Sequence, residues 1–161
     1  MPDSSSNCSI RALATAVAVD SSTPPFMATF DAPNREQVCA RRERSNTPLQ
    51  ALQLMNDIQH FEAARNFAQR MMLEGGATPA ERIAWAWRIV TSRKPTADEL
   101  ATVGHALQQH LAKYRGNVAA AKEAVSYGES KRDERLDPAE LAAYSLVANL
   151  VLNLDETVTK N

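Results

Sequence analysis

Four arginines near the start of the chain are the residues whose types and spacing best suit chemistry: Arg35, Arg41, Arg42 and Arg44. A guanidinium group is a planar fork of N–H donors, which binds carboxylate, sulfate or phosphate through paired hydrogen bonds. Thr47 follows them at a predicted helix start, where free backbone N–H groups also favour an anion. These five residues form a candidate anion-binding patch.

The same arginines also have a structural interpretation. Carboxylates lie nearby in the sequence at Asp31, Glu36, Glu43 and Asp57. Ion pairs with these groups would hold an irregular segment against neighbouring helices, and the segment has few other means of becoming ordered. The sequence favours this structural pairing and leaves the anion patch open as the alternative.

Other site chemistries find little support in the sequence. His105 and His110 are five residues apart, so on a helix they point in different directions and do not chelate one metal, and His60 stands alone. Cys8 and Cys39 form no Cys-x-x-Cys motif, which excludes covalent haem attachment and leaves both unpaired thiols and a disulfide open. With no glycine-rich phosphate loop and no clustered triad, we predict no catalytic residue and no metal site.

Length, composition and charge limit the classes of protein to which this chain can belong. A chain of 161 residues with 44% apolar residues and five glycines is long enough for one domain with its own core. Its 18 basic and 19 acidic residues nearly cancel, which argues against nucleic acid and anionic membrane surfaces as partners. Apolar runs are far shorter than the roughly 20 residues that a membrane span requires.

The first 22 residues differ from the rest of the chain. Their apolar run at 12–19 is short, and Asp3 lies where a signal peptide carries positive charge, so the run makes no convincing signal peptide. We expect residues 1–22 to be a disordered or non-native N-terminus and residues 23–161 to form a single helical domain.

Helix starts are the clearest structural signals. Four share a capping oxygen followed three residues later by Glu or Gln, at 47–50, 78–81, 96–99 and 137–140, and Asp57 offers a fifth cap. The apolar periodicity then predicts helices over 58–73, 78–91, 97–114, 117–127 and 138–154. The last of these is apolar nearly all round, which is typical of a helix at the centre of a bundle.

The segments between the helices are expected to be irregular. Prolines at 24, 25 and 33 predict an extended arm over 21–33, with Phe26, Met27 and Phe30 as apolar anchors. The charged stretch 129–136 is expected to be a solvated loop. The fold class is therefore all-α, an irregular bundle of five or six helices with an extended N-terminal arm.

Several motifs in order resemble one family. They are FMATFDAP at 26–33, Arg35-Glu36, Cys39, Arg41-Arg42, Arg44, NTPLQAL at 46–52, LMND at 54–57, EAAR at 62–65, RKPT at 93–96, LDPAELAAY at 136–144 and the stretch 149–156. This pattern resembles the C-terminal part of the planctomycete cytochrome-c-associated family, classified as domain of unknown function 1553. The resemblance covers roughly residues 23–160.

The resemblance implies a function class rather than a reaction. Members of that family are long, exported, multidomain proteins, often with a haem-binding cytochrome c domain, so the localisation of this chain is left open. No haem motif occurs here, and we expect no cofactor in this chain. We expect a non-catalytic interaction or scaffold module, a fragment of such a protein, whose partners are the other domains or another protein. Its apolar arm and one helix face would leave an exposed patch of several hundred Å², where a missing domain of the parent protein docks.

Two other functions remain open at this point. One is a ligand-binding or enzymatic domain for anionic, sulfated carbohydrate, read by the arginines. The other is an electron-transfer partner of a cytochrome, which would need a complementary charged face.

Overall fold

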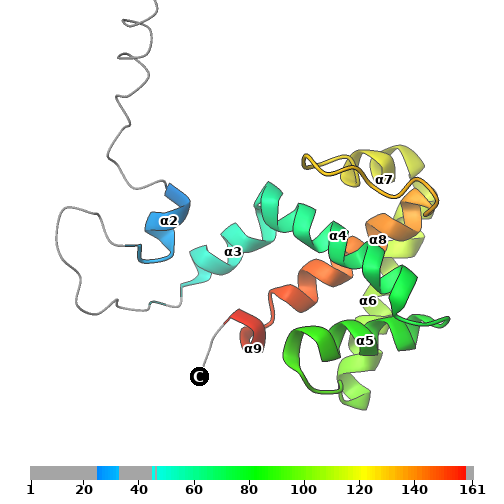
Figure 1. The fold of residues 1–161 in the computed structure, drawn as a ribbon, viewed down its shortest axis with the longest axis horizontal. Coiled ribbons are helices and arrows are strands. Elements are labelled where there is room, and N and C mark those ends of the chain that lie inside the picture. The colour runs from blue at the N-terminus through cyan, green and yellow to red at the C-terminus, as the bar shows by residue number, and fades with distance from the viewer. Residues whose placement is uncertain (1–24, 33–44, 46, 159–161) are drawn as a thin grey trace, which may run out of the picture. The chain divides into compact units, whose positions relative to one another are not determined.

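The computed structural model describes residues 25–32, 45 and 47–158, except the side chains of residues 25 and 26. The chain divides into two units, Met1–Thr47 and Pro48–Asn161. Each unit is described by itself. Throughout the described residues the regular elements are all helices, which confirms the all-α fold class (Figure 1).

In the first unit, α2 spans Pro25–Thr29. The predicted extended arm is therefore wrong at these residues, because Pro25 takes the first helical position, where its missing N–H costs no hydrogen bond. The helix ends in a turn at Asp31, whose φ of 54° is left-handed. Asp31 N–H bonds Ala28 C=O and Ala32 N–H bonds Met27 C=O, the pattern of a Schellman cap.

The second unit is a bundle of seven helices in the described residues (Figure 1). They are α3 Pro48–Asn56, α4 Ile58–Glu74, α5 Pro79–Thr91, α6 Ala97–Gly116, α7 Val118–Ala124, α8 Pro138–Leu152 and α9 Asp155–Val158. Most begin where the sequence predicts, because the signals for their first turns are local.

The caps explain why these helix starts can be predicted from the sequence. Two helices begin with a full capping box, Thr78 with Glu81 in α5 and Thr96 with Glu99 in α6. In each box the threonine hydroxyl accepts a hydrogen bond from the glutamate backbone N–H, and the glutamate carboxylate accepts one from the threonine backbone N–H. Asp57 accepts from the backbone N–H groups of Gln59 and His60 and separates α3 from α4. Asp137 caps α8 in the same way.

Helix α8 is the centre of the bundle. It packs against α4, α5, α6 and α7, and most of its residues are buried, as its all-round apolar sequence predicts. The surrounding helices supply the other core residues: Ala64, Ala68, Met71 and Met72 of α4, Ile83, Ala86 and Trp87 of α5, Val103, Leu107, Leu111 and Tyr114 of α6, Ala121 of α7, and Val125 directly after α7.

In the second unit, three helix ends differ from the predicted boundaries. Helix α6 ends at Gly116 rather than at 114, α7 ends at Ala124 rather than at 127, and α8 ends at Leu152 rather than at 154. A short further helix, α9, follows Leu154 and was not predicted. Thr157 N–H and Val158 N–H bond Leu154 C=O, so α9 is a single turn set by local bonds.

Candidate functional site

The predicted anion patch falls almost entirely outside the described residues. Arg35, Arg41, Arg42, Arg44 and Glu36 belong to that part of the chain. Thr47 is described, and α3 begins directly after it at Pro48, as the sequence predicts. Anion binding by the patch, and pairing of its arginines, stay predictions.

Two of the carboxylates considered as arginine partners have defined local roles. Asp31 accepts hydrogen bonds from Ser45, from the backbone N–H at 2.8 Å and from the hydroxyl at 2.6 Å. Asp57 is the N-cap of α4, with Oδ1 2.9 Å from Gln59 N and 3.0 Å from His60 N. Each carboxylate therefore fixes the backbone of its own segment.

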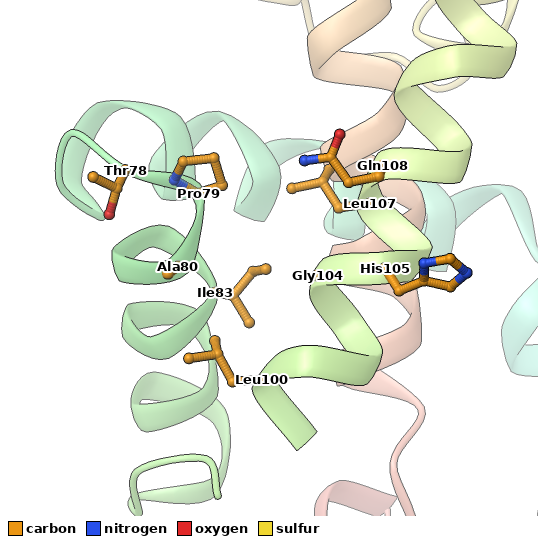
Figure 2. A pocket seen from close by; sticks show the side chains of 9 residues that line it. All are labelled: Thr78, Pro79, Ala80, Ile83, Leu100, Gly104, His105, Leu107 and Gln108. Atoms are coloured by element: carbon orange, nitrogen blue, oxygen red, sulfur yellow. The ribbon is translucent and has the colours of Figure 1, made fainter. Parts of the chain in front are cut away.

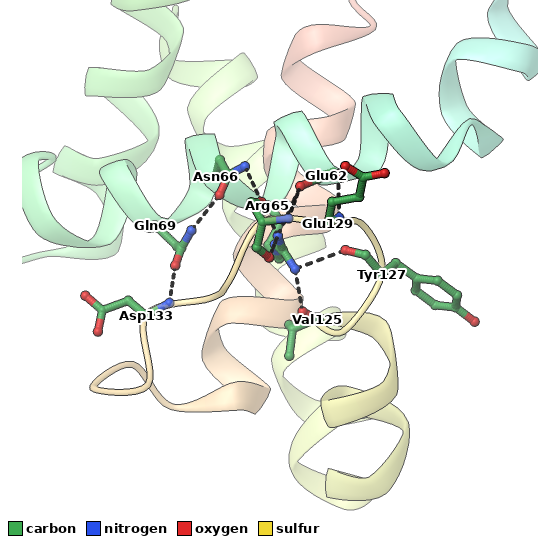
Figure 3. Close-up of polar contacts among 9 residues, drawn as sticks. Glu62, Arg65, Asn66, Gln69, Val125, Tyr127, Glu129 and Asp133 are labelled. Atoms are coloured by element: carbon green, nitrogen blue, oxygen red, sulfur yellow. Dashed lines mark hydrogen bonds and ion pairs between the residues drawn. The ribbon is translucent and has the colours of Figure 1, made fainter.

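The most buried charged side chain is Arg65 of α4, which is 1% exposed. Its guanidinium donates to the carbonyls of Val125 at 2.8 Å, Tyr127 at 3.0 Å and Ser130 at 2.6 Å, in the connection from α7 to α8 (Figure 3). A charged donor that satisfies several backbone carbonyls in a dry setting is a strong structural contact.

Two other α4 side chains complete the attachment of this connection. Glu62 accepts from the backbone N–H groups of Glu129 and Ser130, and Gln69 accepts from that of Asp133 (Figure 3). Hydrogen bonds from Ser130, first its side chain and then its backbone, lower the pKa of Glu62. The stretch 129–136 is therefore a loop, as predicted, but its backbone is fixed to α4.

A second polar cluster surrounds Arg93. Its guanidinium lies 2.7 Å from Glu99 and 2.8 Å from Glu156 of α9, and 5.4 Å from the centre of the Trp87 ring. Hydrogen bonding to Arg93, followed by that to the Thr96 backbone, lowers the pKa of Glu99 to about 2. The cluster joins α9 to the start of α6, and its arginine is already occupied by two carboxylates.

A hollow of about 350 Å³ lies between the start of α5 and α6 (Figure 2). Its lining includes Pro79, Ile83, Leu100 and Gly104, while the His105 ring points away from it. Without a converging set of polar groups, the lining offers no obvious nucleophile, base or anion receptor.

Helix α3 presents an inverted pattern of burial. Its buried residue is a glutamine, Gln50, and Leu54 is half-buried, whereas its other large apolar residues face solvent. We call the following four residues the α3 ridge; their exposed fractions are Leu49 61%, Leu52 57%, Met55 52% and Ile58 58%. Leu49, Leu52 and Met55 recur every third residue along α3, whereas Ile58 follows the break at Asp57, in the first turn of α4.

Sequence reasoning could have found two of these features. Arg65 lies within the apolar stripe of α4, between Ala64 and Ala68, and a charge in such a stripe indicates a buried partner. The α3 ridge is visible as apolar residues at intervals of three, in a stretch whose one charged residue is the capping Asp57. That it faces solvent depends on how α3 packs, which the sequence does not state.

Across residues 25–32, 45 and 47–158, no group of His, Cys, Asp and Glu could hold a metal ion. Within the same part of the chain, no helix is long and apolar enough to cross a membrane.

Comparison with known proteins places the chain in a family. A family model described as "PSD1: Protein of unknown function (DUF1553)" matches residues 2–107, which is 106 of the 161 residues. The matched range includes residues 2–22, outside the resemblance described above, and ends within α6. No curated protein and no solved structure matches the chain. The chain therefore belongs to the PSD1 family, protein of unknown function DUF1553.

Proposed function

We propose that this chain is a non-catalytic interaction module whose contact surface is the α3 ridge. The observation that carries the proposal is the exposure of four large apolar side chains along α3 and at the first residue of α4, while the buried position of α3 holds a glutamine. A helix that folded only to complete this bundle would turn these side chains inward.

The size of the ridge supports this interpretation. Four large apolar side chains, each more than half exposed, offer on the order of 400 Å² of apolar surface. This area matches the largest apolar patch of a typical monomer, roughly 300–600 Å², and such patches are often functional. Single exposed apolar residues, such as Leu73 at 58%, carry no such meaning.

The two best-built polar clusters also fit a structural module. Arg65 is engaged by the connection between α7 and α8, and Arg93 by Glu99 and Glu156. Both clusters join segments of this chain to each other. Most of their donors and acceptors hold the bundle together, although Nε of Arg65 is buried without a hydrogen-bond partner.

Site-specific photo-crosslinking tests the proposal. In one variant a photoreactive amino acid replaces Leu52 of the ridge. In the matched control variant it replaces Leu73, near the C-terminal end of α4. The two leucines have nearly equal exposure, 57% and 58%. Ile58 and Leu73, at the two ends of α4, are separated by about 22 Å of helix.

The expected result is a crosslinked protein of defined mass from position 52, with a crosslinked peptide identified by mass spectrometry, and little from position 73. Equal crosslinking at both positions, or none at position 52 in cells that produce the protein, would contradict a ridge-mediated function.

A further inference from the structure

We infer that residues 126–135, in the connection from α7 to α8, form a strap that opens and closes as one unit while the helical bundle stays folded, and that protonation of Glu62 opens it. The inference goes beyond the proposed function and does not depend on it, because it concerns α4 and this connection rather than the α3 ridge. Val125 before the strap and Ala139 after it are both buried, so the strap is anchored in the core at each end.

The strap itself adds little apolar burial to the fold. Eight of its ten residues are exposed, and the other two, Arg132 and Asp133, are half-buried. Its large apolar residue, Tyr127, is 47% exposed. A segment of this kind leaves the bundle at little cost in hydrophobic free energy, and such segments open well below the free energy of global unfolding.

The strap is attached to the bundle by polar side chains on one face of α4 (Figure 3). Glu62, Arg65, Asn66 and Gln69 have the i, i+3, i+4, i+7 spacing of a single helix face, and each bonds the strap. Most of these bonds go to the strap backbone. Closure therefore depends on the four α4 side chains more than on the side chains of the strap.

Arg65 makes the opening all-or-none. Its guanidinium bonds the carbonyls of Tyr127 at 3.0 Å and Ser130 at 2.6 Å, and it is 1% exposed. If only part of the strap left, this charge would stay desolvated with too few acceptors, whereas complete opening lets water reach it. Gly128, with a φ of 95°, lies between the two bonded carbonyls and supplies the left-handed turn about which the strap moves.

Glu62 is the acid-sensitive attachment. Its carboxylate accepts from the backbone N–H of Glu129 at 3.0 Å and of Ser130 at 2.6 Å. The strap thus presents these N–H groups and the Ser130 hydroxyl to it, and α4 presents the Arg65 guanidinium at 3.7 Å. Protonation turns one carboxyl oxygen into a donor and removes the charge that attracts Arg65, so it weakens every one of these contacts.

The direction of the pH dependence follows from the folded state. Hydrogen bonds from Ser130 lower the pKa of Glu62 below its ordinary 4.5. The contribution of Glu62 to closure is therefore complete above about pH 4.5 and is lost as the pH falls through the lowered pKa.

Amide hydrogen exchange of the full chain, measured by NMR and corrected for intrinsic exchange, tests the inference. The amides of Glu129, Ser130 and Asp133 should exchange through one common opening, at least about tenfold faster than that of Val147 in α8. At about pH 6, Glu62→Gln should speed the three strap amides at least about tenfold and leave α8 unchanged. The matched control is Glu74→Gln, on the same helix, because Glu74 pairs with Arg70 and should not affect the strap.

The pH series completes the test. Below about pH 4.5 the corrected exchange of the strap amides should rise in the wild-type chain and stay level in Glu62→Gln. Equal effects of Glu62→Gln and Glu74→Gln, or a rise that persists in Glu62→Gln, would overturn Glu62 as the group that controls opening. Loss of protection in α8 together with the strap, or opening at 129 and 130 without 133, would overturn the strap as a separate unit.

Discussion

Arg65 shows how one side chain can fix a distant part of the chain. It lies in α4, yet its hydrogen bonds reach residues 125–130, about sixty positions later, with lengths of 2.6–3.0 Å. The free energy of a buried arginine depends on these acceptors, because without them the guanidinium would be desolvated and unpaired. The connection from α7 to α8 is therefore ordered mainly by α4.

Replacement of this arginine should be costly. Arg65→Met is expected to lower the free energy of unfolding by about 3–5 kcal/mol, because it leaves carbonyls such as that of Val125 without a donor. Urea denaturation followed by circular dichroism measures the change. The control is Arg115→Met, since Arg115 pairs with Glu140 at an exposed site and should matter by less than about 0.5 kcal/mol. Equal effects of the two substitutions would refute the structural role of Arg65.

Two glycines should respond to alanine with opposite signs. A Cβ at Gly104, inside α6, meets no atom within 4 Å, so Gly104→Ala should raise the free energy of unfolding by up to about 1 kcal/mol through helix propensity. Gly128 has a φ of 95° and lies against the Glu62 side chain. Gly128→Ala should therefore lower the free energy of unfolding by about 1 kcal/mol or more. Thermal denaturation of both variants decides the matter, and a shift of the same sign in both would contradict this description.

At the scale of elements, the Arg93 cluster makes the bundle sensitive to acid. Because the pKa of Glu99 is lowered to about 2 in the folded state from the ordinary 4.5, its contribution to stability is present above about pH 4.5. That contribution is lost as the pH falls from about 4.5 towards 2. Glu99→Gln should therefore lower the melting temperature at pH 7, and the difference from wild type should shrink across this range.

NMR titration of the Glu99 carboxyl checks the cause. In Arg93→Met the pKa of Glu99 should move up towards 4.5, since the largest stabilising hydrogen bond is gone. A wild-type pKa already near 4.5 would exclude the proposed pairing.

Elements differ in how far the sequence predicts them. The starts of α4, α5, α6 and α8 are predictable because each cap is made by residues within three positions of one another. The central place of α8 follows from its apolar sequence. By contrast, the burial of Arg65 depends on acceptors contributed by a remote connection, and no local pattern encodes that pairing.

The candidate site is likewise predictable from the sequence only in part. The interval of three between the ridge residues is in the sequence, and an exposed patch of the apolar arm with one helix face was predicted, without naming the helix. Which face of α3 meets the bundle is decided by tertiary packing. Asn149 of α8 donates to Met55 C=O at 3.2 Å, a contact across 94 positions that helps to set this orientation. The arginine patch, which the sequence marks most strongly, remains a prediction.

At the scale of the whole molecule, the second unit is a helical support with an apolar stripe at one of its helices. The core is formed by α4, α5, α6, α7 and α8, whereas α3 contributes little apolar burial to it. A stable bundle that keeps α3 with its leucines outward is consistent with a surface kept for association. This is the central claim of the proposed function.

Oxidative footprinting of Met55 tests that claim most directly. Met55 is 52% exposed and Met71 is fully buried, so in the purified chain below 1 µM hydroxyl radicals should oxidise Met55 much faster than Met71. In cells that produce the protein, an interaction module should show Met55 protected several-fold relative to the purified chain, because the ridge is covered by its partner. Equal oxidation of Met55 in both settings would show that nothing packs on the ridge and would contradict the proposed function.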